Sequence, residues 1–178
     1  QIQYTTGNLV LDNTIAITDL DNTLITGGTV AITNNFISAE DELLFTNQLG
    51  ITGSYSAATG ILTLAGTTTL ANYGSALQTI AYHNTQLIPT QVTRRVSFEV
   101  SDGSANSVPF NKFIGITPVN YPPFFVDGSG NPITTIPFAT GEDTQLNTCV
   151  NVADPNGDPV SLSSIVLLTG SGSFNLTG

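Results

Sequence analysis

The chain of 178 residues is long enough for one domain or two small ones, and only 9% of its residues are charged, against roughly 25% in an average soluble domain. Its polarity comes from 27 Thr, 16 Asn and 14 Ser, which favour strands and turns, and the shortage of Lys, Glu and Arg excludes a helical bundle. Thirteen acidic against three basic residues give a net charge of −10, which excludes nucleic acid as a general partner and argues against docking on anionic lipid. No apolar run of about 18 residues occurs, so we expect no membrane insertion.

Short stretches of alternating apolar and polar residues dominate the first part of the chain. Turn signals such as Gly27-Gly28 and Asp102-Gly103 separate them. The predicted strands are residues 15–18, 29–32, 43–45, 61–64 and 96–100. Short strands separated by such turns are typical of an antiparallel β-sandwich, so the predicted fold class is all-β.

One segment follows a different period. Between residues 70 and 82 the apolar side chains recur at spacings of three and four, which is the pattern of one helical face. This predicts a short helix over about residues 70–80, with Thr68 or Thr69 as its N-cap.

A proline-rich segment interrupts the pattern after the first unit. Pro118, Pro122 and Pro123 fix backbone angles and remove hydrogen-bond donors, which predicts a stiff, extended connector. We therefore expect a sandwich at residues 1–118 and a second, partial sandwich at residues 119–178, with strands near residues 132–139, 145–152 and 160–168. The chain starts in strand-like sequence and ends abruptly, so we expect it to be a piece of a longer protein.

Groups for catalysis are scarce. Cys149 is the single cysteine, which excludes an intrachain disulfide, and the single histidine, His83, lies on the other side of the proline connector. The sequence contains no Gly-x-Ser-x-Gly elbow, no phosphate-binding loop and no Cys/His cluster for zinc or iron. We therefore expect no enzymatic activity.

The acidic residues gather in turns, where two interpretations remain open. Ca²⁺ binds carboxylate, amide and carbonyl oxygens, so these turns are candidate calcium sites; Asp and Asn also sit in ordinary turns because they bond to their own backbone. The candidate ligands are Asp154, Asn156, Asp158 and Asp102, in turns expected at domain ends, and then Asp19 and Asp21. A further acidic turn is Glu40-Asp41-Glu42.

Several ordered motifs carry a family resemblance. They are residues 17–22, 50–55, 60–66, 71–77, 80–85 and 96–103, in a pattern that covers about residues 9 to 117. This pattern resembles the cadherin-like repeats of very large bacterial surface proteins and, less closely, the proteoglycan-type repeats of animal matrix proteins. Residues 154–160 resemble the opening of a further Ig-like or cadherin-like repeat.

The resemblance implies tandem Ig-like or cadherin-like units and calcium at their junction. In cadherins, a linker Asp and Asn, an Asp-x-Asp turn and acidic loops bind Ca²⁺ and stiffen the joint. Asn120, Asp154, Asn156 and Asp102 match that pattern, whereas Tyr121 stands where a linker carboxylate is expected. The departure at Tyr121 leaves the prolines as an alternative source of stiffness.

These observations predict a non-catalytic adhesion or stalk module of a large extracellular or cell-surface bacterial protein. Its expected partners are other cell-surface proteins or polysaccharide, together with adjacent repeats of the same polypeptide. The alternative is a carbohydrate-binding or accessory module of a secreted polysaccharide-degrading system. A flat platform of exposed Tyr or Phe would favour that alternative, and the candidates are Tyr55, Tyr73, Tyr82 and Tyr121.

Overall fold

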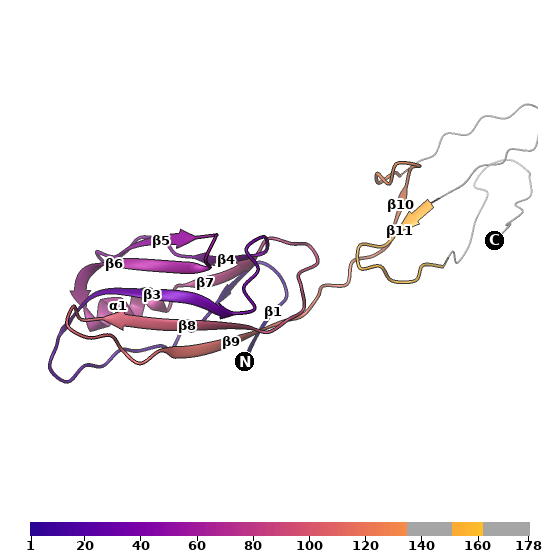
Figure 1. The fold of residues 1–178 in the computed structure, drawn as a ribbon. Coiled ribbons are helices and arrows are strands. Elements are labelled where there is room, and N and C mark those ends of the chain that lie inside the picture. Colours follow the sequence, from indigo (N-terminus) through magenta and orange to yellow (C-terminus); the bar gives the residue numbers. More distant parts are fainter. Residues whose placement is uncertain (135–150, 162–178) are drawn as a thin grey trace, which may run out of the picture. The chain divides into compact units, whose positions relative to one another are not determined.

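The computed structural model describes residues 1–134 and 151–161 (Figure 1). The chain divides into two units, Gln1–Val119 and Asn120–Gly178, which are called the first and second unit below. Cys149 and most of the strands expected at residues 132–139, 145–152 and 160–168 lie outside the described residues.

The first unit contains a six-stranded sheet that forms one of its two layers. In spatial order its strands are β1 (Ile2–Tyr4), β9 (Phe110–Ile116), β8 (Arg94–Ser101), β3 (Leu24–Asn34), β6 (Ile61–Thr69) and β5 (Thr52–Ser56). β1 runs parallel to β9, and all other neighbours in this sheet are antiparallel.

A smaller antiparallel sheet forms the second layer. Its strands, in spatial order, are β2 (Asn8–Val10), β7 (Ala81–Asn84) and β4 (Asp41–Leu44). The core lies between the layers: Val30, Leu62 and Val96 of the larger sheet belong to the same buried cluster as Leu43 and Tyr82 of the smaller one. The prediction of an all-β sandwich is confirmed.

The strand β8 shows why the alternating pattern predicts this fold. Arg94, Val96, Phe98 and Val100 are buried, whereas Arg95 between them is exposed. Successive side chains of a strand point to opposite faces, so every second residue enters the core.

The predicted helix is confirmed as α1 (Leu70–Leu77). Its N-cap is Thr69, whose hydroxyl accepts a hydrogen bond from the backbone N–H of Asn72 at 3.2 Å. The helix ends at Leu77, slightly before the predicted end, because the chain turns into β7 at Ala81. The Tyr73 hydroxyl donates to the Gly66 carbonyl at 2.6 Å and so ties the buried face of the helix to β6.

Removal of this hydroxyl tests the attachment of the helix. We expect Tyr73→Phe to lower the free energy of unfolding by about 1 kcal/mol, because the Gly66 carbonyl loses its donor while the buried ring is kept. Urea denaturation measures the change. Tyr121→Phe is the control, since the Tyr121 hydroxyl donates to no described residue; an equal effect of the two substitutions would contradict the prediction.

The strand predicted at residues 15–18 is wrong. The segment is extended and alternates between half-buried Ile15 and Ile17 and exposed Ala16 and Thr18, yet it pairs with no strand of the described chain. The cause lies in the smaller sheet. Its pairing ends where Val10 meets Ala81, because the residues before β7 form α1 instead of a longer strand.

In the second unit, the described residues contain one antiparallel pair, β10 (Phe124–Val126) and β11 (Asn151–Ala153). Phe125 lies opposite Val152 in this pair. The segment between β9 and β10 has neither helix nor strand, in agreement with its prolines.

Candidate functional site

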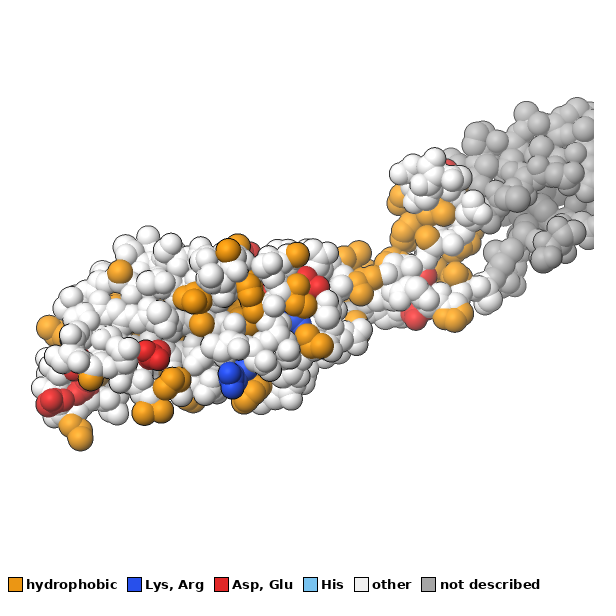
Figure 2. Space-filling model, viewed as in Figure 1, with side chains coloured by type: hydrophobic (Ala, Val, Ile, Leu, Met, Phe, Trp, Pro, Cys, Tyr) orange, Lys and Arg blue, Asp and Glu red, His pale blue; other side chains and the backbone are white. Residues whose placement is uncertain are grey.

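Three of the predicted calcium ligands come together at one end of the first unit. Asp19 and Asp21 lie in the loop before β3, and Asp102 follows β8; Gly27 of β3 lies opposite Ser101 of β8, so loop and turn meet. Asn22 connects them, because its side-chain amide donates to Asp102 Oδ2 at 2.5 Å. Figure 2 shows acidic side chains at the left-hand end of this unit.

The pKa shifts of the three carboxyl groups at this acidic end differ in direction. Backbone N–H groups of Asn22 and Asp21 donate to Asp19 and lower the pKa of its carboxyl group. The N–H groups of Ala105 and Ser104 likewise lower the pKa of Asp102. The pKa of Asp21 is raised, because its carboxyl group shares a hydrogen bond with Asp19 and faces its negative charge. A proton or a cation relieves that repulsion.

The carboxylates of Asp19, Asp21 and Asp102 do not by themselves form a complete metal-binding site. Across residues 1–134 and 151–161, no three His, Cys, Asp or Glu side chains have the spacing of a metal site. Asp19 and Asp102 each use one oxygen on backbone donors, and Asn22 stands between the two turns. A cation bound here needs amide or carbonyl oxygens in addition to the carboxylates.

The candidate residues of the second unit form a hydrogen-bonded turn. Asp154 Oδ1 accepts from the backbone N–H groups of Asn156 at 2.8 Å and Asp158 at 3.2 Å. Asn156 Oδ1 accepts from the backbone N–H of Tyr121 at 2.7 Å, so this turn holds the residue that departs from the cadherin linker pattern. These contacts are those of an Asx turn.

The direction of β9 decides how Asp102 is grouped. β8 and β9 are antiparallel, with Arg94 opposite Ile114, so the chain leaves β9 at the end of the sheet remote from Asp102. Asp102 belongs to the first unit and Asp154 to the second. Within the first unit, the carboxylates that accompany Asp102 are therefore those of Asp19 and Asp21.

The turn at Glu40 and Asp41 is an ion-pair site that sequence reasoning missed. Arg94, with no exposed surface, donates from Nε to both carboxylate oxygens of Asp41 at 3.2 Å, and its Nη2 lies 3.0 Å from Glu40 Oε2. Its Nη1 donates to the carbonyls of Thr90 and Val92, at 2.6 and 2.7 Å. The alternation of β8 was the available signal, because it places Arg94 on the inward face, where a cation needs a buried carboxylate.

A second ion pair joins Lys112 of β9 to the buried Asp12. Lys112 Nζ lies 2.6 Å from Asp12 Oδ2, and Thr14 donates to Oδ1 through both its N–H and its hydroxyl. The hydrogen bond from Lys112 lowers the pKa of Asp12 from 3.8 to about 2. The two ion pairs occupy two of the three basic residues of the chain.

The lowered pKa of Asp12 predicts a stability change in acid. Because the carboxylate is favoured in the folded state, its contribution is present above pH 3.8 and is lost as the pH falls towards about 2. We expect the difference in unfolding free energy between the natural chain and Lys112→Met to shrink over that range. Denaturant titrations at several pH values measure it, and a difference independent of pH would contradict the assignment.

The expected aromatic platform is not present among the tyrosines of the first unit. Tyr73 and Tyr82 are fully buried, since they lie on the inward faces of α1 and β7. Tyr55 is half-buried and donates its hydroxyl to the Asp41 carbonyl at 2.8 Å, and Tyr121 of the second unit is also half-buried. Tyr55, Tyr73 and Tyr82 pack in or against the core, so these three candidates form no exposed platform. The exposed aromatic side chains of the described residues include Phe110 and Phe113 of β9.

Comparison with known proteins finds one informative similarity. The chain is 37% identical over 81 residues to halomucin of Haloquadratum walsbyi, a match that covers 43% of this chain and 1% of halomucin. The chain is thus similar to a short stretch of a very long protein. No family model and no solved structure matches, so the cadherin-like resemblance stays a prediction.

No helix in the described part of the chain is long and apolar enough to cross a membrane.

Proposed function

We propose that the chain is a non-catalytic adhesion or stalk module of a large extracellular or cell-surface protein. The observation that carries this proposal is the similarity to halomucin, because the matched stretch is only 1% of that protein and its name describes a mucin, a class of extracellular proteins. Adjacent units of the same polypeptide and other surface proteins or polysaccharide are its proposed partners.

The charged residues support the proposal of an extracellular module, because the basic side chains are engaged within the fold and the surface is left acidic. Arg94 and Lys112 are engaged in ion pairs, and the Arg95 Nε donates to the Thr33 hydroxyl at 2.9 Å. The remaining surface is acidic and rich in uncharged polar groups, since the net charge is −10. Such a charge keeps protein chains apart and soluble.

Labelling of intact cells tests the location. An antibody raised against the chain should label unpermeabilised cells that make the natural protein, because a surface module is accessible from outside. Labelling that appears only after permeabilisation would contradict the proposal.

Calcium is the proposed stabilising ion. At about 10 mM Ca²⁺ and a dissociation constant of about 0.1–1 mM, typical of extracellular modules, binding to the folded state alone should stabilise it by about 1.4–2.7 kcal/mol. The physical reason is the crowding of Asp19, Asp21 and Asp102, whose repulsion a divalent cation removes. Thermal melts in Ca²⁺, Mg²⁺ and chelator at one ionic strength measure the effect.

Charge-matched variants separate binding from general screening. Asp19→Asn should abolish the calcium-dependent increase in melting temperature, whereas Glu42→Gln, which removes the same charge from β4, should retain it. Asp154→Asn reports separately on the second unit. Equal melting temperatures in calcium and in chelator would leave all these carboxylates as turn residues.

A further inference from the structure

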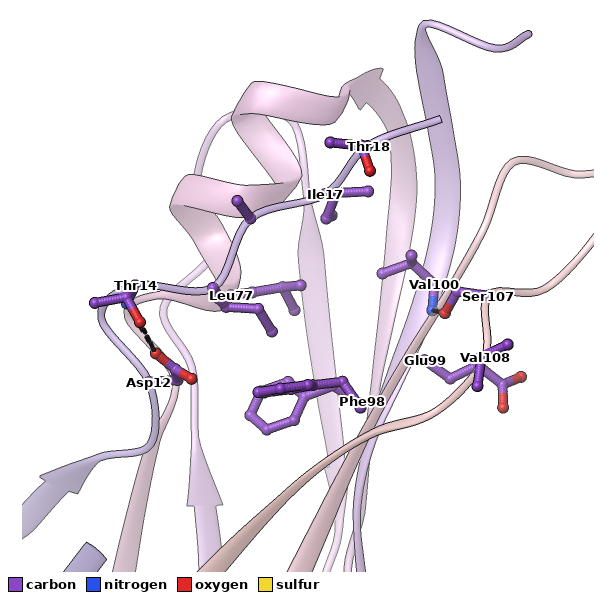
Figure 3. Close-up of a pocket in the computed structure, with 13 residues that line it drawn as sticks. Asp12, Thr14, Ile17, Thr18, Leu77, Phe98, Glu99, Val100, Ser107 and Val108 are labelled. Carbon is purple, nitrogen blue, oxygen red and sulfur yellow. Dashed lines mark hydrogen bonds between the residues drawn. The ribbon is translucent and has the colours of Figure 1, made fainter. Parts of the chain in front are cut away.

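An open groove of about 450 Å³ lies at one side of the first unit. Its floor is apolar and consists of Leu77 of α1 with Phe98 and Val100 of β8. One wall is the extended segment of residues 12–18, and the other is the segment that enters β9 at residues 107–110 (Figure 3).

The first wall is a segment that pairs with no strand of the described chain. Ile15 and Ile17 turn inward and Ala16 and Thr18 outward, as in a strand with one buried face. Within the described chain the backbone of residues 16–18 makes no hydrogen bond, and the Ile15 carbonyl accepts only from the Gln78 side chain, at 2.9 Å. Unpaired backbone along an extended segment is the template on which another strand adds.

The second wall exposes apolar side chains. Val108 is 88% exposed and Phe110 45% exposed, although both line the groove. On the side of β9 away from β8, pairing with β1 begins only at Ile114, so residues 110–113 have no strand neighbour there within the described chain. An extended peptide would cover both walls at once, whereas a compact ligand would leave the backbone of residues 16–18 unpaired.

The charged residues along the groove indicate which net charge a bound ligand should carry. Asp12 and Glu99 are the charged residues that line it. Lys112 balances the charge of Asp12, because its Nζ lies 2.6 Å from Asp12 Oδ2 and 5.7 Å from the centre of the Phe110 ring. Glu99 accepts from the neutral side chain of Asn106 at 2.7 Å, so its negative charge is not balanced by that contact. Such a rim disfavours an acidic strand and favours one that carries Lys or Arg.

We infer that this groove is a strand-acceptor site for an extended segment of a partner protein, with apolar side chains at alternate positions and Lys or Arg between them. The segment pairs through its backbone with residues 15–18, places its apolar side chains on Leu77, Phe98 and Val100, and directs a cation to Glu99. A second copy of the chain is a poor occupant, because each copy carries a net charge of −10. This inference is independent of calcium binding.

Fluorescence anisotropy with a designed probe tests the inference. The probe is a labelled peptide of about nine residues in which valine alternates with lysine and threonine; a second peptide has glutamate for lysine. The full chain should bind the lysine peptide about tenfold more tightly than the glutamate peptide. Ala16→Pro should weaken binding about tenfold, because it removes a backbone donor that the new strand needs, while the folded chain loses no hydrogen bond.

Two further variants keep the result interpretable. Ala57→Pro, in the turn between β5 and β6, makes the same substitution away from the groove and should leave binding unchanged. Val108→Ser removes apolar surface from the exposed wall without a folding penalty and should also weaken binding. Equal binding by all four proteins, no binding of either peptide at about 1 mM, or self-association that Ala16→Pro abolishes would each overturn the proposal.

Discussion

Replacement of Arg94 by methionine is expected to lower the free energy of unfolding of the first unit by about 3–5 kcal/mol. Arg94 has no exposed surface and donates to Asp41, Glu40 and two backbone carbonyls. Methionine fills much of the volume but leaves Asp41, itself buried, as an uncompensated charge. The loss of stability therefore arises more from the buried, unpaired carboxylate of Asp41 than from the lost attraction between Arg94 and Asp41.

Chemical denaturation of the single and double variants measures this cost. Arg94→Met with Asp41→Asn should recover part of the loss, because the buried charge is removed and the amide oxygen can still accept from the Tyr82 hydroxyl, as Asp41 Oδ1 does at 2.6 Å. The recovery is incomplete because the Ile37 N–H, which donates to Asp41 Oδ2 at 2.8 Å, loses its acceptor. Arg95→Met, on the exposed face of β8, is the control and should change stability by less than about 0.5 kcal/mol. A double variant no more stable than Arg94→Met alone would contradict this account.

The periodic parts of the fold could be predicted from the sequence because they depend on local rules. Alternation predicts β8, and spacing by three and four with a threonine cap predicts α1. The same alternation at residues 15–18 predicts a strand that does not pair, because pairing requires a neighbour and α1 ends the smaller sheet at Ala81. Pattern indicates the conformation of a segment, whereas the topology decides whether the segment finds a partner.

The candidate site likewise depends on features that the sequence predicts and on contacts that only the topology brings about. The sequence identifies Asp19, Asp21 and Asp102 as turn carboxylates, but only the pairing of β3 with β8 brings the two turns together. The turn at Glu40 and Asp41 carries a similar acidic signal and yet faces Arg94, more than 50 residues later in the chain. Composition alone cannot distinguish a carboxylate that is available to bind a cation from one that already forms an ion pair with a buried arginine.

Gly66→Ala is the second large effect that we expect, with a loss of at least about 3 kcal/mol. Gly66 has a φ of +135°, which L side chains rarely adopt, and a Cβ there would collide with the backbone carbonyl oxygen of Gly50. The carbonyl of Gly66 also accepts from Tyr73, so a shift of the backbone that relieves the collision would pull on α1.

Gly7→Ala measures the cost of a positive φ at a site without a collision. Gly7 also has a positive φ, +74°, but an added Cβ meets no atom within 4 Å, so this variant should lose only about 1 kcal/mol. The difference between the two denaturation midpoints reports two effects at Gly66 together, its φ of +135° and the close approach of β6 to the backbone of Gly50. Equal losses would contradict both; a larger loss for Gly66→Ala shows that the motif of residues 60–66 needs glycine at this position.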